Sequence, residues 1–97
     1  MNAVEQRLTA LEEANRVRLG QYGLRKQIAH GETTAAEVIR EQEFPTMTIG
    51  SVLGAQHRWG KHRVRHFCTV AGVTETKRIG TLTERQVNLI CEQLGEA

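Results

Sequence analysis

The sequence predicts an all-α fold of about five helices. Apolar residues recur three and four positions apart in several segments, residues that cap helices separate these segments, and no segment alternates apolar with polar residues as strands do. The chain has 97 residues, of which 39% are hydrophobic and 25% are charged. This length supports one hydrophobic core, and the composition is too polar for a membrane protein.

The first thirty residues predict one long helix or two collinear helices. They contain no proline, and apolar residues occur at helical spacing from Leu8 to Ile28. Glycine destabilises a helix interior by about 1 kcal/mol relative to alanine. Gly20 and Gly23 therefore predict a bend or break near residues 20–23, and Gly31 is expected to end the segment.

Capping signals predict two short helices after this segment. Thr34 and Glu37 have the spacing of a capping box, so a second helix should run to about Gln42, before Pro45. Thr48 can cap a third helix. The apolar positions of that helix are Ile49, Val52 and Leu53.

The last two predicted helices have continuous apolar faces. A fourth helix should follow the turn at residues 58–60 and end at Gly72, and residues 73–82 should form a loop. The last helix should begin after Thr83, whose partner in a second capping box is Gln86. The apolar face of the fourth helix consists of Val64, Phe67, Cys68 and Ala71, and that of the last helix consists of Val87, Ile90, Cys91 and Leu94.

Positive charge is concentrated between residues 58 and 78. The whole chain has a formal net charge of +2, whereas this segment has six basic residues and one acidic residue, Glu75. The six basic residues are Arg58, Lys61, Arg63, Arg65, Lys77 and Arg78. A compact basic block is typical of a surface that binds a polyanion, and the alternative is a basic face exposed to solvent.

The start of the predicted fourth helix resembles a phosphate site. A helix N-terminus carries partial positive charge and unpaired N–H groups, so three potentially cationic residues in this first turn are unfavourable unless an anion binds. Glycine at position 60 would let a phosphate approach the backbone, and a basic pair in the next loop would form a second clamp. We predict contacts from Gly60, Lys61 and Arg63 and from Lys77 and Arg78, with support from Arg58, His62 and Arg65.

Residues 58–94 resemble the helix-two-turns-helix module of the actinobacterial integration host factor. The pattern of that family is matched by Gly60-Lys61, the helix to Ala71, Lys77-Arg78 and Leu82-Thr83. Residues 24–39 resemble the basic helix, glycine and threonine-capped short helix of the same family. One departure is Gly80, which stands where the family tends to have a third basic residue.

The resemblance implies a small monomeric nucleoid-associated protein with no enzymatic activity, cofactor or metal. Such a protein binds duplex DNA with low sequence specificity, bends or stiffens it, and assists a phage integrase, and a phage-encoded or diverged member would fit the departures. We expect an N-terminal helical extension over residues 1–22 and a globular DNA-binding domain over residues 23–97, with the module at 48–95. Dimerisation through the first helix stays open.

Two other functions remain open. The same module occurs in a small-subunit ribosomal protein, so RNA or ribosome binding is one alternative, and a partner-binding helical bundle is the other. Enzymatic activity is not expected, because the chain has no Asp and no phosphate loop, dinucleotide fingerprint or metalloprotease motif. The charged N-terminus does not resemble a signal peptide, so we expect a cytoplasmic protein located on the nucleoid.

Cys68, Cys91 and Trp59 could carry other chemistry but are interpreted as packing residues. His62 and His66 have a spacing that could share a metal with cysteines. Cys68 and Cys91, however, fall on apolar faces and are predicted to be small buried residues with reduced thiols. Trp59 could insert between base pairs, but we interpret it as joining the third helix to the fourth.

Overall fold

The computed structural model describes residues 2–95, and Met1, Glu96 and Ala97, which the predicted domain ranges include, lie outside these. The helices are α1 (Ala3–Ala29), α2 (Ala35–Glu41), α3 (Ile49–Gly54), α4 (Lys61–Ala71) and α5 (Glu84–Gln93), with a turn of 3-10 helix, η1 (Ile79–Thr81). Residues 2–95 contain no strand, and the predicted all-α fold is confirmed. None of these helices is long and apolar enough to cross a membrane.

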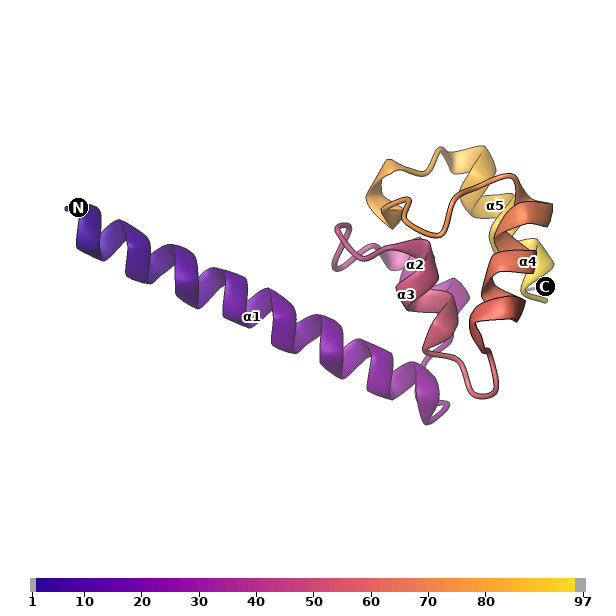
Figure 1. Ribbon diagram of the computed structural model, residues 1–97, viewed down its shortest axis with the longest axis horizontal. Helices are drawn as coiled ribbons and strands as arrows, with labels where there is room; N and C mark the ends of the chain where they lie inside the picture. Colours follow the sequence, from indigo (N-terminus) through magenta and orange to yellow (C-terminus); the bar gives the residue numbers. More distant parts are fainter. Residues whose placement is uncertain (1, 96–97) are drawn as a thin grey trace.

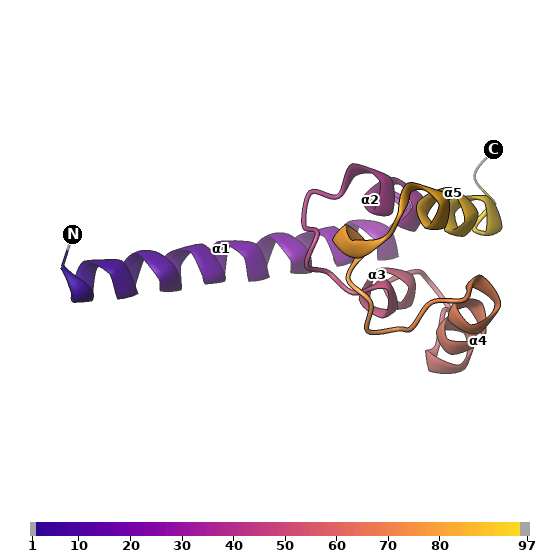
Figure 2. The ribbon, with the colours of Figure 1, turned by 90° about the horizontal axis from the view of Figure 1, so that it is seen from above.

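Helices α2 to α5 pack together, and α1 extends away from them as a long arm (Figure 1). The view from above shows the same arrangement, with only the C-terminal end of α1 beside the other helices (Figure 2). Ile28 is the one residue of α1 that is buried. The fully buried large side chains are Ile39, Ile49, Val52, Leu53, Ile79, Ile90 and Cys91.

Threonine side chains cap three of the helices, as the sequence predicts. Each of these hydroxyls accepts a hydrogen bond of 3.1 Å from the backbone N–H three residues later. The three are Thr34, Thr48 and Thr83. The capping box at Thr83 is complete, whereas the one at Thr34 is half formed, because the carboxylate of Glu37 accepts a hydrogen bond from Thr33 instead.

The bend or break predicted near residues 20–23 is wrong, because α1 is one continuous helix through both glycines and has no kink along its length (Figure 1). A Cβ atom at Gly20 would lie 2.3 Å from Cζ of Phe44, so this glycine makes room for an aromatic ring from the α2–α3 connection. A Cβ at Gly23 would have nothing within 4 Å. Tertiary packing thus explains Gly20 where helix propensity alone suggested an interruption.

The predicted loop at residues 73–82 is paired along its backbone with residues 45–50. The two segments are joined by four backbone hydrogen bonds of 2.8 to 2.9 Å. They also form an isolated antiparallel bridge between Thr48 and Arg78. The four run from Ile49 N to Lys77 O, from Gly50 N to Glu75 O, from Ile79 N to Met47 O and from Gly80 N to Pro45 O. The loop therefore has a fixed position beside the start of α3, which the sequence did not predict.

Two glycines allow the paired segments to approach. A Cβ at Gly50 would lie 3.0 Å from the carbonyl oxygen of Glu75. At Gly80 a Cβ would lie 2.5 Å from Cβ and 3.0 Å from the carbonyl oxygen of Pro45. Because these neighbours belong to the backbone or lie next to it, they cannot move aside without disturbing the pairing.

We expect Gly80→Ala to lower the free energy of unfolding by about 1–2 kcal/mol, because the added methyl group overlaps Pro45. Gly54→Ala is the control, since its Cβ would make only an ordinary contact, 3.9 Å from a methyl group of Val64. Urea unfolding followed by circular dichroism measures both. Equal midpoints for the two variants would contradict a tight pairing at position 80.

Candidate nucleic-acid interface

Helix α4 begins without a side-chain cap. Its N-cap is Gly60, in extended conformation, and no described side chain accepts a hydrogen bond from the first turn. The residues of that turn, Lys61, His62 and Arg63, are all exposed. An uncapped N-terminus presents free N–H groups and partial positive charge, and the cationic side chains add to this charge. This turn therefore has the free N–H groups and the positive charge on which the predicted anion site rests.

The start of α4 faces the paired loop across an open hollow of about 470 Å³. Its lining includes Gly60 and Lys61 at the start of α4, Glu75 and Thr76 of the paired loop, and Gly50 with its neighbours in α3. The hollow thus joins the first predicted clamp to the loop that carries the second. The structure brings these two elements together although they are separated by the whole of α4.

Backbone pairing positions the second basic pair. Lys77 is half-buried, and its carbonyl oxygen accepts a hydrogen bond of 2.8 Å from the N–H of Ile49. Arg78 is exposed and is bridged to Thr48 through the backbone. Since main-chain bonds hold this segment, the two basic side chains are not required for its position.

Glu75 is the acidic residue within this basic region. Its carboxylate accepts a hydrogen bond of 3.1 Å from Nε of Arg65, and the side chains of Glu75 and Arg65 are 38% and 71% exposed. Burial raises the pKa of the Cys68 thiol, and the negative charge of Glu75 raises it further. Glu75 therefore neutralises one cation of the predicted site and lowers the positive potential around the hollow.

Arg63 is directed to another side of α4. Its guanidinium lies over the ring of Trp59, 4.3 Å from the ring centroid, in a cation–π arrangement. Trp59 in turn packs edge to face with Phe67, at a centroid distance of 5.5 Å and an interplanar angle of 64°. Trp59 is half-buried against the core, as its interpretation as a packing residue expects. Arg63 lines a second hollow with these two rings and does not share the first one with Lys61.

The remaining predicted residues flank these groups. Arg58 is exposed in the turn before α4 and has a positive φ of 65°, a conformation that costs energy in a residue with a side chain. His62 is exposed beside Lys61. The structure therefore gathers Gly60, Lys61, Lys77 and Arg78 around the start of α3, and it directs Arg65 to Glu75 and Arg63 to Trp59. Whether each residue binds an anion stays a prediction.

Sequence reasoning missed two features of the site. It counted Glu75 as a charge without placing it on Arg65, and it did not predict the pairing that positions Arg78. The sequence signal for the pairing is weak, because Gly50 and Gly80 are two glycines among 9, and neither has a positive φ. Their role follows only from the backbone atoms that lie against them.

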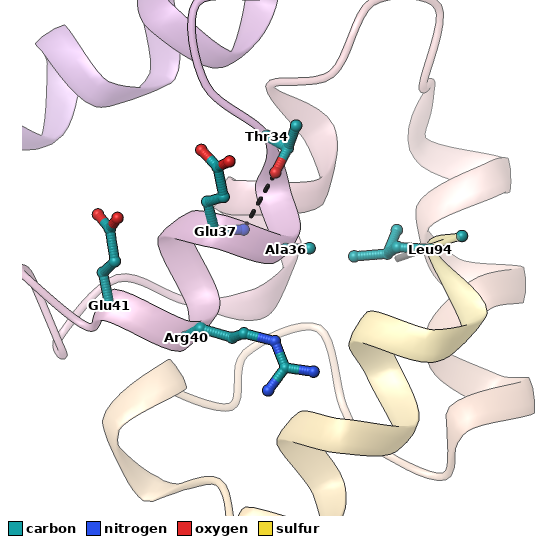
Figure 3. A pocket seen from close by; sticks show the side chains of 7 residues that line it. Thr34, Ala36, Glu37, Arg40, Glu41 and Leu94 are labelled. Carbon is teal, nitrogen blue, oxygen red and sulfur yellow. Dashed lines mark hydrogen bonds between the residues drawn. The ribbon is translucent and has the colours of Figure 1, made fainter. Parts of the chain in front are cut away.

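A separate hollow of about 550 Å³ lies between α2 and α5 (Figure 3). Its lining includes two carboxylates, those of Glu37 and Glu41, together with the guanidinium of Arg40 and the apolar side chain of Leu94. Arg40 donates a hydrogen bond of 3.1 Å to Asn88 of α5. The two carboxylates disfavour a phosphate in this hollow.

Both cysteines are buried, which confirms their interpretation as small core residues. The relative exposure of Cys68 is 2% and that of Cys91 is 0%, and both are free thiols. Sγ of Cys91 lies 3.7 Å from the carbonyl oxygen of Ala36. Within residues 2–95, no three or more His, Cys, Asp or Glu residues are grouped so that they could hold a metal ion.

The fold is similar to that of a protein whose structure was solved in complex with DNA. No profile of a known protein family matches the sequence, and no curated protein matches it. The solved structure of sIHF bound to an 8-base-pair palindromic DNA has a TM-score of 0.78 to this chain, with 22% sequence identity. The likeness covers 84% of this chain and 97% of the sIHF chain. The fold implied by the resemblance of the α4–α5 segment is therefore present.

We expect Trp59→Leu to lower the free energy of unfolding by about 2 kcal/mol, because it removes the ring that packs against Phe67 and carries Arg63. Val70→Ala, at an exposed position of α4, should change the free energy of unfolding by less than about 0.5 kcal/mol. Thermal unfolding followed by circular dichroism measures both variants. A Trp59 variant as stable as the parent would reopen its interpretation as a residue held ready to insert between bases.

Proposed function

We propose that this chain is a nucleoid-associated protein that binds duplex DNA through phosphates, with low sequence specificity, in the manner of an integration host factor. One observation carries the proposal: the uncapped start of α4 lines an open hollow together with Glu75 and Thr76, which directly precede Lys77 and Arg78 in the paired loop. Two separate sources of positive charge held at a fixed spacing suit the repeating phosphates of a nucleic acid backbone. The similarity in fold to sIHF, whose solved structure contains DNA, supports the proposal of DNA binding.

In this proposal the two clamps act differently. At the start of α4, a phosphate oxygen accepts hydrogen bonds from backbone N–H groups near Gly60, and Lys61 adds a charge. In the loop, the charges of Lys77 and Arg78 are carried by a backbone that is already fixed by pairing. Because none of these groups reads a base edge, sequence preference should be low.

The wider role is proposed on the same basis. A phosphate-binding protein of this kind shapes DNA in the cytoplasm and assists recombination beside a phage integrase, and it does so without enzymatic activity. Shaping of DNA needs only a bound duplex, since deformation of DNA is sustained by contacts with its backbone. RNA or ribosome binding and partner binding by the helical bundle are outcomes that the experiment below distinguishes.

Fluorescence anisotropy with a short labelled duplex, a single strand and an RNA hairpin of matched length tests the proposal over a salt series. We expect a preference for the duplex. If about five phosphates are contacted, log K should fall against log salt with a slope of about −4 to −5. A slope near zero would remove the electrostatic mechanism, preference for the hairpin would favour the ribosomal alternative, and no binding would favour a protein partner.

We expect Lys77→Ala combined with Arg78→Ala to weaken binding to all duplexes alike and to reduce the salt slope by about 2. The thermal unfolding midpoint should hardly change, because main-chain bonds hold this segment. The matched control is Arg16→Ala combined with Arg85→Ala, which removes the same charge from exposed positions on α1 and α5. Equal losses of affinity in both double variants would show an effect of net charge alone.

We expect Glu75→Gln to raise duplex affinity about two- to fivefold at low salt, because it removes the negative charge that pairs with Arg65. Pairing with Gly50 uses the backbone of Glu75, so the fold should be retained. Glu92→Gln is the control, with the same charge change at an exposed position of α5. Anisotropy titrations compare the two, and lower affinity for the Glu75 variant would mean that the ion pair organises the site.

A further inference from the structure

The arm formed by α1 carries an apolar stripe that the rest of the chain leaves uncovered. The large apolar side chains of this helix that are exposed are Val4, Leu8, Leu11, Leu19 and Tyr22, with relative exposures between 51% and 63%. At about 100° per residue these five positions fall within about 80° of arc, so they share one face of the helix. An uncovered stripe of this length is unusual on a monomer and indicates an interface.

The N-terminal part of the stripe, from Val4 to Leu11, lies away from the body of the protein, whereas Tyr22 lines a hollow that it shares with Gly50 and Gly54 of α3. Gly20, Leu24 and Ile28 are the positions of α1 that lie against Phe44 or pack with the core. Counted around the helix, they project about 100° to 180° from Val4, Leu8 and Leu11. Residues 3–16 of the arm are exposed along their whole length and extend beyond the other helices (Figures 1 and 2). A second helix could therefore lie along Val4, Leu8 and Leu11 without contacting helices α2 to α5.

The spacing of the stripe is that of a short coiled coil. In the heptad repeat abcdefg of a coiled coil, Leu8, Asn15 and Tyr22 occupy the first position, a. Val4 and Leu11 occupy the fourth position, d. An Asn at one a position is a known device that fixes register and favours a pair of helices, because two such side chains can bond to each other across the seam. Arg18 at the next d position limits the continuous apolar seam to the N-terminal part of the arm.

The flanking charges select a second copy in parallel orientation. In this register Arg7 occupies a g position and Glu12 the following e position, which are the two positions that meet between parallel helices. Two identical chains would form this pair twice. In an antiparallel pair e positions face e positions, so that Glu5 and Glu12 of the two chains would meet and repel each other.

Other occupants fit the arm less well. Residues 2–19 carry three basic side chains, Arg7, Arg16 and Arg18, and three acidic ones, Glu5, Glu12 and Glu13. This balance gives no net attraction to the phosphates of a nucleic acid or to an anionic membrane surface. We therefore propose that the α1 arms of two copies of this chain associate as a parallel coiled coil through Val4, Leu8, Leu11 and Asn15. This inference is independent of the proposed function.

Sedimentation velocity of the full chain tests the proposal from low micromolar to submillimolar concentration at low salt. We expect the average mass to rise with concentration towards that of a dimer, since a seam of this length is weak. Leu8→Glu should abolish the rise, whereas Gln6→Glu, which adds the same charge on the opposite side of the arm, should leave it unchanged. A constant monomer mass, or association that survives Leu8→Glu, would overturn the proposal.

Charge reversal tests the pairing of Arg7 with Glu12. Arg7→Glu and Glu12→Arg should each raise the dimer dissociation constant about threefold or more, because each replaces two attractions with two repulsions. The double variant restores both attractions and the original net charge, so its dissociation constant should return to that of the parent. Failure of the double variant to recover would overturn the assigned register.

Cross-linking tests the orientation. Asn15→Cys places two thiols opposite each other across a parallel seam, and the native Cys68 and Cys91 are buried. Under mild oxidation we expect a disulfide-linked dimer for this variant, but not for the parent or for Gln6→Cys on the outer face. Equal cross-linking of the two variants, or none in either, would overturn the parallel arrangement.

Discussion

The antiparallel backbone pairing between residues 45–50 and 75–80 is the interaction on which the candidate site depends. It fixes the loop after α4 against the start of α3, and two buried side chains, Met47 and Ile79, hold the paired segments to the core. Main-chain bonds are insensitive to the side chains that project from them, so cations can occupy this loop without a cost to its conformation. Gly80 also acquires a physical reason here, because a basic side chain at that position would collide with Pro45.

The helix N-termini of this fold differ in one respect that matters for anions. Helices α2, α3 and α5 each have a threonine that satisfies an N-terminal N–H group, whereas the N-cap of α4 is Gly60, which has no side chain to do so. The uncapped end is therefore the one around which cationic side chains are gathered. Glu75 reduces this positive charge, because its carboxylate forms an ion pair with Arg65. The pair is partly exposed to solvent, so salt screens it.

Local signals allowed most of the fold to be predicted, and tertiary contacts account for what was missed. The helix boundaries follow from threonine caps and from glycines such as Gly72, whose φ of 75° few other residues adopt. Gly20 misled the prediction, because its neighbour Phe44 is distant in sequence. The candidate site shows the same division between local signals and tertiary contacts. The cationic first turn of α4 could be predicted from the sequence. The orientation of Arg63 towards Trp59 and of Arg65 towards Glu75 could not, because it depends on which face of α4 each neighbour covers.

The separation of the arm from the body divides the stability of the chain into two parts. The first half of α1 is held by hydrogen bonds within the helix and by the reciprocal cap between Asn2 and Glu5, and it buries almost no side chain. Melting this half exposes little new apolar surface and so takes up little additional heat capacity, whereas the body, with its buried core, unfolds cooperatively. Helical content and core packing therefore report on different transitions, and the share of the helical signal that is lost cooperatively is the share that reports on the body.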